Sequence, residues 1–257
     1  MSGHLPAVRG ARALLCLAAL WSAAAAYAAH APEILTLPAG ARVGVVNLLD
    51  PEVTHFHAAR QMQDSFLKTY TMGWPVAALL MASVSERLKS LGLSALAVEP
   101  GEALARARED CFLNASLAKG LPKECARLYA QLAATQQLSA LIVLGPGRND
   151  SAHAGSTRRR ELPEYLRGWC FVSGTGGAGE APTLLSLTEM LLIGVTPAGA
   201  ELVARQWGGN GHSWQGYQAP ADLKAIPEAQ LEQLRPLYTA MLKEQADALL
   251  THLQVAR

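Results

Sequence analysis

After its first 28 residues, the sequence has no apolar run of about eighteen residues, the length at which a membrane-spanning helix is expected. We therefore expect no membrane span in the mature chain. An excess of charge is also missing, because 22 Lys and Arg residues stand against 21 Asp and Glu residues. Two of the basic residues lie in residues 1–28, so the remainder has 20 basic against 21 acidic residues and a net charge of −1. This balance gives no electrostatic reason to expect nucleic acid as a partner.

The motifs of common catalytic sites are also missing. The sequence has no Gly-x-Ser-x-Gly, and Ser116-Leu-Ala-Lys119 has only the spacing of a Ser-x-x-Lys pair. The glycine-rich Gly174-Thr-Gly-Gly-Ala-Gly179 is followed by Pro182 and not by Lys-Ser/Thr and a helix, so it is typical of a turn. Gly145-Pro-Gly-Arg148 lacks the dinucleotide-binding pattern. The sequence therefore favours a protein without a catalytic nucleophile or phosphate loop.

The first residues have the order of a secretory signal peptide. Arg9 and Arg12 precede the apolar run Ala13–Ala26, and Ala26-Tyr27-Ala28 supplies the small residues of a cleavage site. We expect cleavage of residues 1–28 and a periplasmic or secreted mature protein. If the segment is retained, the protein is membrane-anchored. Leu15-Cys16 departs from the small-residue-then-Cys pattern of a lipoprotein signal.

Three cysteines remain after this segment, Cys111, Cys125 and Cys170. An oxidising compartment favours a Cys111–Cys125 disulfide. A loop of that size contributes ~3 kcal/mol in the chain-entropy model. The alternative is three buried thiols, and the sequence does not decide between the two.

Three short apolar runs predict strands that are covered on both faces: Arg42–Leu49, Ser94–Val98 and Ser139–Leu144. Helical segments separate them, at Pro75–Leu91 and at 101–137 with a break near Gly120. Strands that alternate with helices in this way pair in parallel through right-handed crossovers.

The second half of the chain predicts antiparallel strands. A strand at Trp169–Ser173 precedes two longer strands, at about Leu184–Val195 and Glu201–Trp207. The turn residues Pro197-Ala198-Gly199 join these two as a hairpin. A long closing helix starts near Pro227, with apolar residues at helical spacing.

The fold class predicted from this order is α/β, with one mixed sheet of three parallel strands plus an antiparallel hairpin region, flanked by helices. We expect a short linker at 29–41 and a single domain at 42–257. Two long excursions interrupt it, at 50–74 and at 145–167. The first is predicted as a loop with a short helix at Ala58–Thr69.

The element order resembles that of exported α/β domains. They are the periplasmic domain of the curli secretion channel, the amino-terminal domain of the Tol–Pal β-propeller protein and the outer-membrane lipoproteins that activate penicillin-binding proteins. The resemblance covers about 42–255, and its carriers are Val43-Gly-Val-Val-Asn-Leu48, Leu141-Ile-Val-Leu-Gly145 and Thr196-Pro-Ala-Gly199. It implies assembly or partner binding in the bacterial envelope without catalysis, and it transfers no functional residue.

Open sheets of this type bind ligands beyond the carboxyl ends of their parallel strands. Asp50 and Glu52 follow the first strand, Glu99 follows the second, and Arg148 lies in the segment after the third. Long loops in compact domains are often functional. We therefore predict the binding site at the 50–74 loop, for an envelope protein or a small ligand.

Within that loop, His55-Phe-His57 places two imidazoles on one side of an extended chain, where both can reach one ion. Further ligands would come from Asp50, Glu52, Glu99 or His212, and zinc is the cofactor that such a set would hold. The pair also resembles the His-x-His of amidohydrolases, but their eight-fold strand–helix alternation is absent. A metal-dependent hydrolase is therefore the alternative function. The favoured interpretation is that the two rings hydrogen-bond to backbone or pack with Phe56.

Two further features remain open from the sequence. Trp214 ends an aromatic-flanked glycine-rich loop. It contacts a glycan or protein if exposed, and plugs the end of the sheet if buried. Arg158-Arg159-Arg160 is typical of a solvated charge run, although it can pair with an acidic partner.

Overall fold

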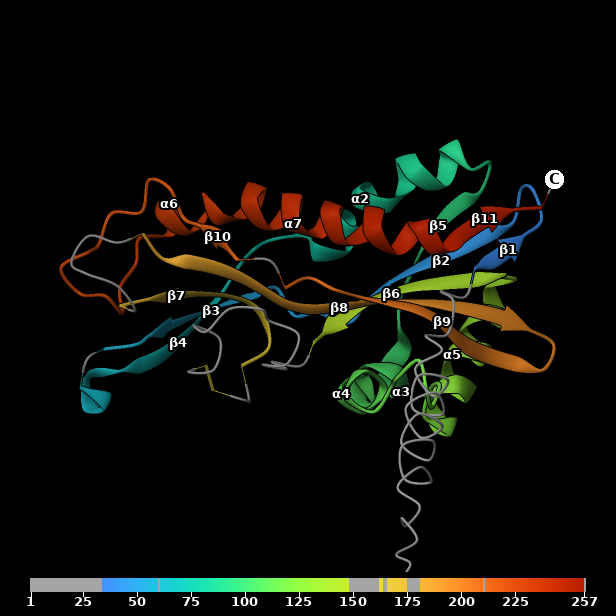
Figure 1. Ribbon diagram of the computed structural model, residues 1–257, viewed down its shortest axis with the longest axis horizontal. Helices are drawn as coiled ribbons and strands as arrows, with labels where there is room; N and C mark the ends of the chain where they lie inside the picture. The colour runs from blue at the N-terminus through green and yellow to red at the C-terminus, as the bar shows by residue number, and fades with distance from the viewer. Residues whose placement is uncertain are drawn as a thin grey trace, which may run out of the picture. The chain divides into compact units, whose positions relative to one another are not determined.

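A mixed β-sheet with helices on both faces organises the part of the chain that the computed structural model describes (Figure 1). The described residues are 34–59, 61–147, 162–163, 166–174, 181–209 and 211–256. The predicted signal segment 1–28, Arg148 and Arg158-Arg159-Arg160 lie outside them, so those predictions stay predictions.

The structure contains the following elements. The strands are β1 (Leu35–Leu37), β2 (Arg42–Asn47), β3 (Glu52–His57), β4 (Phe66–Thr71), β5 (Ser94–Val98), β6 (Ala140–Pro146), β7 (Gly168–Ser173), β8 (Thr183–Thr196), β9 (Gly199–Trp207), β10 (His212–Ser213) and β11 (Leu253–Val255). The helices are η1 (Met62–Asp64), α2 (Val76–Ser90), α3 (Gly101–Arg106), α4 (Arg108–Leu113), α5 (Lys123–Gln136), α6 (Glu228–Leu231), α7 (Leu234–Leu249) and η4 (Leu250–His252).

The strands of the main sheet lie in the order β4-β3-β7-β8-β6-β2-β5, with β9 and β10 also paired to β8. Strand β2 is parallel to both β5 and β6, as the apolar runs predict. The long strand β8 joins two parts of the sheet, because it pairs antiparallel with β7 through its first half and with β6 through its second. The mixed α/β architecture expected from the sequence is therefore confirmed.

The apolar side chains of β2 point alternately into two cores. Val43 and Val45 pack in the cluster that includes α2 and α7, and Val46 packs in the cluster that includes α3, α4 and α5. Figure 1 shows the two groups of helices on opposite faces of the sheet. A strand buried on both faces needs an unbroken apolar sequence, which is why β2 and β6 can be predicted from sequence. The expectation that Ser94–Val98 is also covered on both faces is wrong, because β5 ends the strand order and only its Val98 is buried.

Helix α2 follows the predicted signals closely. Pro75 precedes its first residue, and Gly92 follows its end with φ +74°, a left-handed conformation that favours glycine. Its buried side chains lie at helical spacing, and they are Val76, Leu80, Ser83, Val84 and Leu88. None of the helices in the described residues combines the length and apolarity that crossing a membrane requires.

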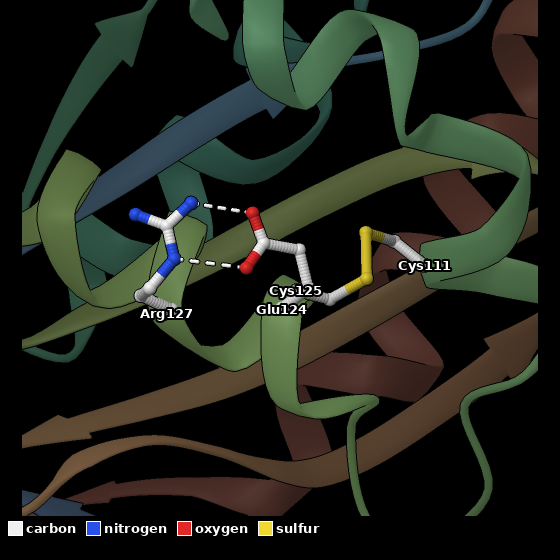
Figure 2. Close-up of a disulfide and its surroundings, with 4 residues drawn as sticks. All are labelled: Cys111, Glu124, Cys125 and Arg127. Carbon is white, nitrogen blue, oxygen red and sulfur yellow. Dashed lines mark hydrogen bonds and ion pairs between the residues drawn. A yellow bond between two sulfur atoms is a disulfide. The ribbon is translucent and has the colours of Figure 1, made fainter.

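A disulfide between Cys111 and Cys125 joins α4 to α5, as Figure 2 shows. The two cysteines are 14 residues apart, and Gly120 turns the chain between them with φ +73°. The disulfide interpretation is thus the correct one of the two. Cys170 is a buried residue of β7 and takes no part in a disulfide.

The prediction of a loop with a short helix over residues 50–74 is wrong. This segment forms the antiparallel hairpin β3–β4, connected through η1. The reason lies in the sequence pattern, because Glu52–His57 and Phe66–Thr71 are rich in β-branched and aromatic residues, which favour strands. Polar residues among them obscure the alternation.

The two ends of the domain also differ from the prediction. The expected linker 29–41 contains β1, which pairs in parallel with β11 at the end of the chain. Leu253, predicted in the closing helix, lies in β11. That helix is divided into α6 and α7, and Pro236 lies in the first turn of α7. A proline further along a helix would clash with the carbonyl four residues earlier, so a new helix begins just before Pro236.

Candidate functional site

A cleft of about 130 Å³ lies where the carboxyl ends of β2 and β6 meet the beginning of β3 and β7. It is lined by the segment that follows β2, by β3, β6 and α4, and by the start of β7: Leu48, Leu49, Asp50, Glu52, Thr54, Arg108, Glu109, Pro146, Arg167 and Gly168. This edge of the parallel strands is where the sequence places the site, and Asp50 and Glu52 are both in the cleft.

Asp50 and Arg108 form a two-point ion pair at this cleft. Arg108 Nη1 lies 2.7 Å from Asp50 Oδ1, and Nη2 lies 2.6 Å from Oδ2. The hydrogen bond from Arg108 to Asp50 is the main cause that raises the pKa of Arg108. The pair therefore connects the end of β2 to α4.

Two more carboxylates lie beside this pair. Glu52 and Glu109 are exposed, and their charges also raise the pKa of Arg108. Within the described residues, neither carboxylate forms an ion pair. The lining of the cleft holds three carboxylates against the two arginines Arg108 and Arg167, so its formal charge is 2 − 3 = −1, which a cationic group can neutralise.

The two histidines of β3 meet at one serine. His55 Nε2 lies 2.7 Å from Ser173 Oγ, and His57 Nδ1 lies 2.8 Å from the same oxygen. Strand β3 runs beside β7 with His57 paired to Ser173, which brings the three side chains to one face. A hydroxyl has one proton, so Ser173 donates to one imidazole and accepts from the other.

Aromatic rings surround this group. His55 stacks on Phe171 with ring centroids 4.4 Å apart, and His57 stacks on Phe66 at 5.1 Å. Burial and, to a smaller extent, the nearby His57 lower the pKa of His55 to about 4, against a smaller opposite effect of the Leu223 backbone. Burial also lowers the pKa of the less buried His57. Both rings are therefore neutral at pH 7.

This geometry meets only one requirement of the zinc hypothesis, the placement of two imidazoles on one side of the strand. Both imidazoles point to the same side of β3, as the His-x-His spacing predicts. However, the described residues contain no group of three or more His, Cys, Asp or Glu side chains placed to hold a metal ion. His212 lies on the short strand β10, where its Nε2 is 3.9 Å from the Glu244 carboxylate.

Two further predicted residues, Glu99 and Trp214, are not among those that line the cleft. Glu99 follows β5, is exposed and is not among the residues that line the cleft. Trp214 is fully buried and packs edge-on against Phe171 with centroids 5.2 Å apart, so it plugs the sheet end and presents no surface to a ligand. Arg148 lies outside the described residues.

Sequence reasoning missed Arg108 and Ser173. Arg108 is 58 residues from its partner Asp50, and Ser173 is 118 residues from His55. Each is an ordinary residue of its own element, and only the pairing of distant strands and helices makes it a site residue. The predicted strand Trp169–Ser173 contains Ser173, but the sequence does not show that β3 with its two histidines lies beside this strand.

Comparisons with known proteins give no family for this chain. No family model matches the sequence, and no curated protein matches it. Among solved structures, the chain is similar to a hypothetical protein from Chlamydia trachomatis, with 10% sequence identity and a TM-score of 0.40. That match covers 83% of this chain and 95% of the other.

Proposed function

We propose that this protein is exported to the bacterial envelope and binds a partner, without catalysis, through the cleft beside Asp50 and Arg108. The observation that carries the proposal is the position of the cleft at the carboxyl ends of β2 and β6, the edge where open α/β sheets bind their ligands. Its volume of about 130 Å³ is below the roughly 300–1,000 Å³ of small-molecule sites. A cleft of this size fits one protruding side chain of a partner.

The charges of the cleft favour a basic side chain. Glu52 and Glu109 are exposed and unpaired within the described residues, while Asp50 is neutralised by Arg108. A lysine or arginine of the partner can therefore form charge-assisted hydrogen bonds with Glu52 and Glu109. The same charges would disfavour an acidic side chain at this place.

Two features support the proposed location. The first 28 residues have the charged, apolar and small-residue order of a secretory signal. The Cys111–Cys125 disulfide is typical of proteins that fold in an oxidising compartment such as the periplasm.

Amino-terminal sequencing of the full-length product, expressed in a bacterium and recovered from its periplasm, tests the export. We expect the mature chain to begin at Ala29. A product that keeps Met1 and stays with the membrane contradicts cleavage and supports the anchored form.

The cleft is tested with Nα-acetyl-arginine amide as a probe of a partner's basic side chain. In a titration followed by protein NMR, we expect the backbone signals of Glu52, Thr54 and Gly168 to shift. Replacing both Glu52 and Glu109 by Gln should weaken the shifts, whereas Glu86→Gln on the exposed surface of α2 should leave them unchanged. If Nα-acetyl-glutamate amide shifts the same signals equally, the charge argument fails.

A further inference from the structure

The outer border of the main sheet at β4 is a surface that the proposed cleft does not use. Strand β4 is the last strand in the sheet order and pairs with β3 alone. Figure 1 shows it at the rim of the β3–β4 hairpin. Among the described residues, nothing pairs with its other side. No strand of the described residues therefore uses the backbone groups on that side.

The hydrogen bonds of the hairpin show which residues face outward. The Met72 amide donates to the Pro51 carbonyl at 2.7 Å, so this pair is hydrogen-bonded across the hairpin. Because antiparallel pairs alternate between bonded and non-bonded, every second residue of β4 turns its N–H and C=O away from β3. On β3, the bond from Ala58 N to Ser173 O of β7 fits the same alternation. The outward residues are Leu67, Thr69 and Thr71.

One face of this border carries Leu67 beside Thr69 and Thr71. The Leu67 side chain is 42% exposed, which makes it one of three exposed large apolar residues in the described part of the chain. It lies opposite the partly buried Phe56 of β3. A strand added beside β4 would cover Leu67 with an apolar side chain of its own.

The other face of the border carries two lysines, with one carboxylate, Asp222, close enough to raise the pKa of Tyr70 after the larger effect of burial, so its net charge is positive. Lys68 Nζ lies 6.0 Å from the ring centroid of Tyr70, and Lys224 Nζ lies 5.2 Å from that of Phe66. Phe66, Lys68 and Tyr70 are alternate residues of β4, so the two ammonium groups are on the same face. Neither forms an ion pair with a carboxylate of the described residues.

These charges distinguish between two occupants of the border. A second copy of this chain, paired β4 to β4 about a two-fold axis, would bring two Lys68 and two Lys224 side chains to one face. Lysines on edge strands prevent such edge-to-edge association. An extended segment with acidic side chains on that face has the complementary charge instead.

We propose that the β4 border binds an extended acidic segment of a partner protein by strand addition. The backbone groups of Leu67, Thr69 and Thr71 supply the ladder, acidic side chains of the segment lie beside Lys68 and Lys224, and apolar ones lie beside Leu67. In this mode of recognition the backbone provides affinity and the alternate side chains provide specificity. This border adjoins the cleft, because Thr69 and Thr71 lie opposite Thr54 and Glu52, but it is a different binding surface and its test reads the outward amides of β4.

The probe is a fluorescent octapeptide in which Glu and Val alternate, with a Lys and Val octapeptide as the comparison. Binding to the full chain is measured by fluorescence anisotropy, and backbone amide hydrogen exchange by NMR. We expect the acidic peptide to bind at least about tenfold more tightly than the basic one, because two opposite charges meet Lys68 and Lys224. The amides of Leu67, Thr69 and Thr71 should exchange more slowly when it is bound.

Two substitutions at one position separate the backbone from the side chain. Thr69→Pro removes an outward N–H and should weaken binding of the acidic peptide at least about tenfold, because Pro cannot donate to a ladder. Thr69→Val loses the hydroxyl that lies 3.3 Å from Thr54 Oγ1 but keeps the N–H, so it should bind like the original chain. Equal binding by the Thr69→Pro and Thr69→Val chains would overturn the proposal.

Charge reversal gives a test that does not depend on the folding of the proline variant. Lys68→Glu combined with Lys224→Glu should weaken the acidic peptide about tenfold and favour the basic one. Lys119→Glu, at an exposed position between α4 and α5, should change neither. The proposal fails if both peptides bind with equal affinity, if neither binds, or if the protected amides lie away from β4.

Discussion

His55 Nε2 and Ser173 Oγ lie 2.7 Å apart in the interior of the sheet, and this hydrogen bond joins two neighbouring parallel strands. His55 is fully buried, and Ser173 is 8% exposed. The hydrogen bond therefore compensates for the hydration that the His55 imidazole loses on burial. It also links the hairpin β3–β4 to the rest of the sheet, so the protonation of His55 bears on the stability of the whole region.

We predict that the protein loses stability as the pH falls from about 6.5 to about 4. The folded-state pKa of His55 is about 4, below its ordinary value of 6.5, because burial disfavours the imidazolium. The unfolded chain therefore takes up a proton first, and the stability present above pH 6.5 is lost as the pH falls through this window. A difference of this size corresponds to about 3 kcal/mol.

Urea unfolding at pH 7 and pH 4.5 measures this effect. The His55→Gln protein has no titratable group at position 55. It should therefore show a smaller loss of unfolding free energy between the two pH values. His252→Gln, which keeps His55, should retain the full loss. If the His55→Gln protein loses as much stability as the unchanged protein, His55 is not the cause.

The Cys111–Cys125 disulfide should stabilise the domain by ~3 kcal/mol, since it closes a loop whose ends are 14 residues apart. Cys111→Ser combined with Cys125→Ser should lower the urea midpoint by the corresponding amount. Alkylation without reduction should label neither cysteine in the native-sequence protein. Labelling of both, followed by an unchanged midpoint in the double variant, would contradict the disulfide.

The sequence predicts the cleft better than it predicts the hairpin beside it, and the reason is burial. Val43, Val45 and Val46 lie in a strand covered on both faces, so their apolar run shows the strand and its parallel pairing. The carboxyl end of that strand then locates Asp50. No strand of the described residues pairs with the outer side of β4, and this strand carries Lys68 and exposed threonines, so its alternation is weak. The partners Arg108 and Ser173 come from distant elements that only the folded chain brings together.

We predict that any side chain at Gly145 destabilises the fold, because the ring of Phe112 occupies the space. A Cβ at Gly145 would lie 2.3 Å from Phe112 Cε2, in the packing between β6 and α4. We expect Gly145→Ala to cost about 1–3 kcal/mol of unfolding free energy, the usual range for overpacking. Gly73→Ala is the matched control, since nothing lies within 4 Å of its added Cβ.

The overpacking should be relieved by a smaller neighbour. In the Gly145→Ala background, Phe112→Leu should cost less than it does alone, so the two changes are not additive. Thermal unfolding of the four proteins in this cycle measures the coupling. Additive effects would show that the strain at Gly145 does not come from Phe112.

The last prediction concerns Glu189 and Arg205, which form an ion pair between β8 and β9. The Glu189 side chain is fully buried, and the Arg205 side chain is 14% exposed. Arg205 also donates to the Ala115 carbonyl at 2.6 Å and lies over the ring of Trp207, with its Cζ 4.9 Å from the centroid. Arg205 therefore holds the hairpin against the segment that follows α4.

Breaking a buried ion pair by removing one partner typically costs about 3–5 kcal/mol. We expect a loss of this order for Arg205→Met, measured by urea unfolding at pH 7. Adding Glu189→Gln should recover part of it, because the buried side chain then carries no charge. The control is Arg127→Met, which breaks the fully exposed pair with Glu124 shown in Figure 2 and should leave the unfolding free energy nearly unchanged. If the double variant is less stable than Arg205→Met alone, the charge of Glu189 is compensated by groups other than Arg205.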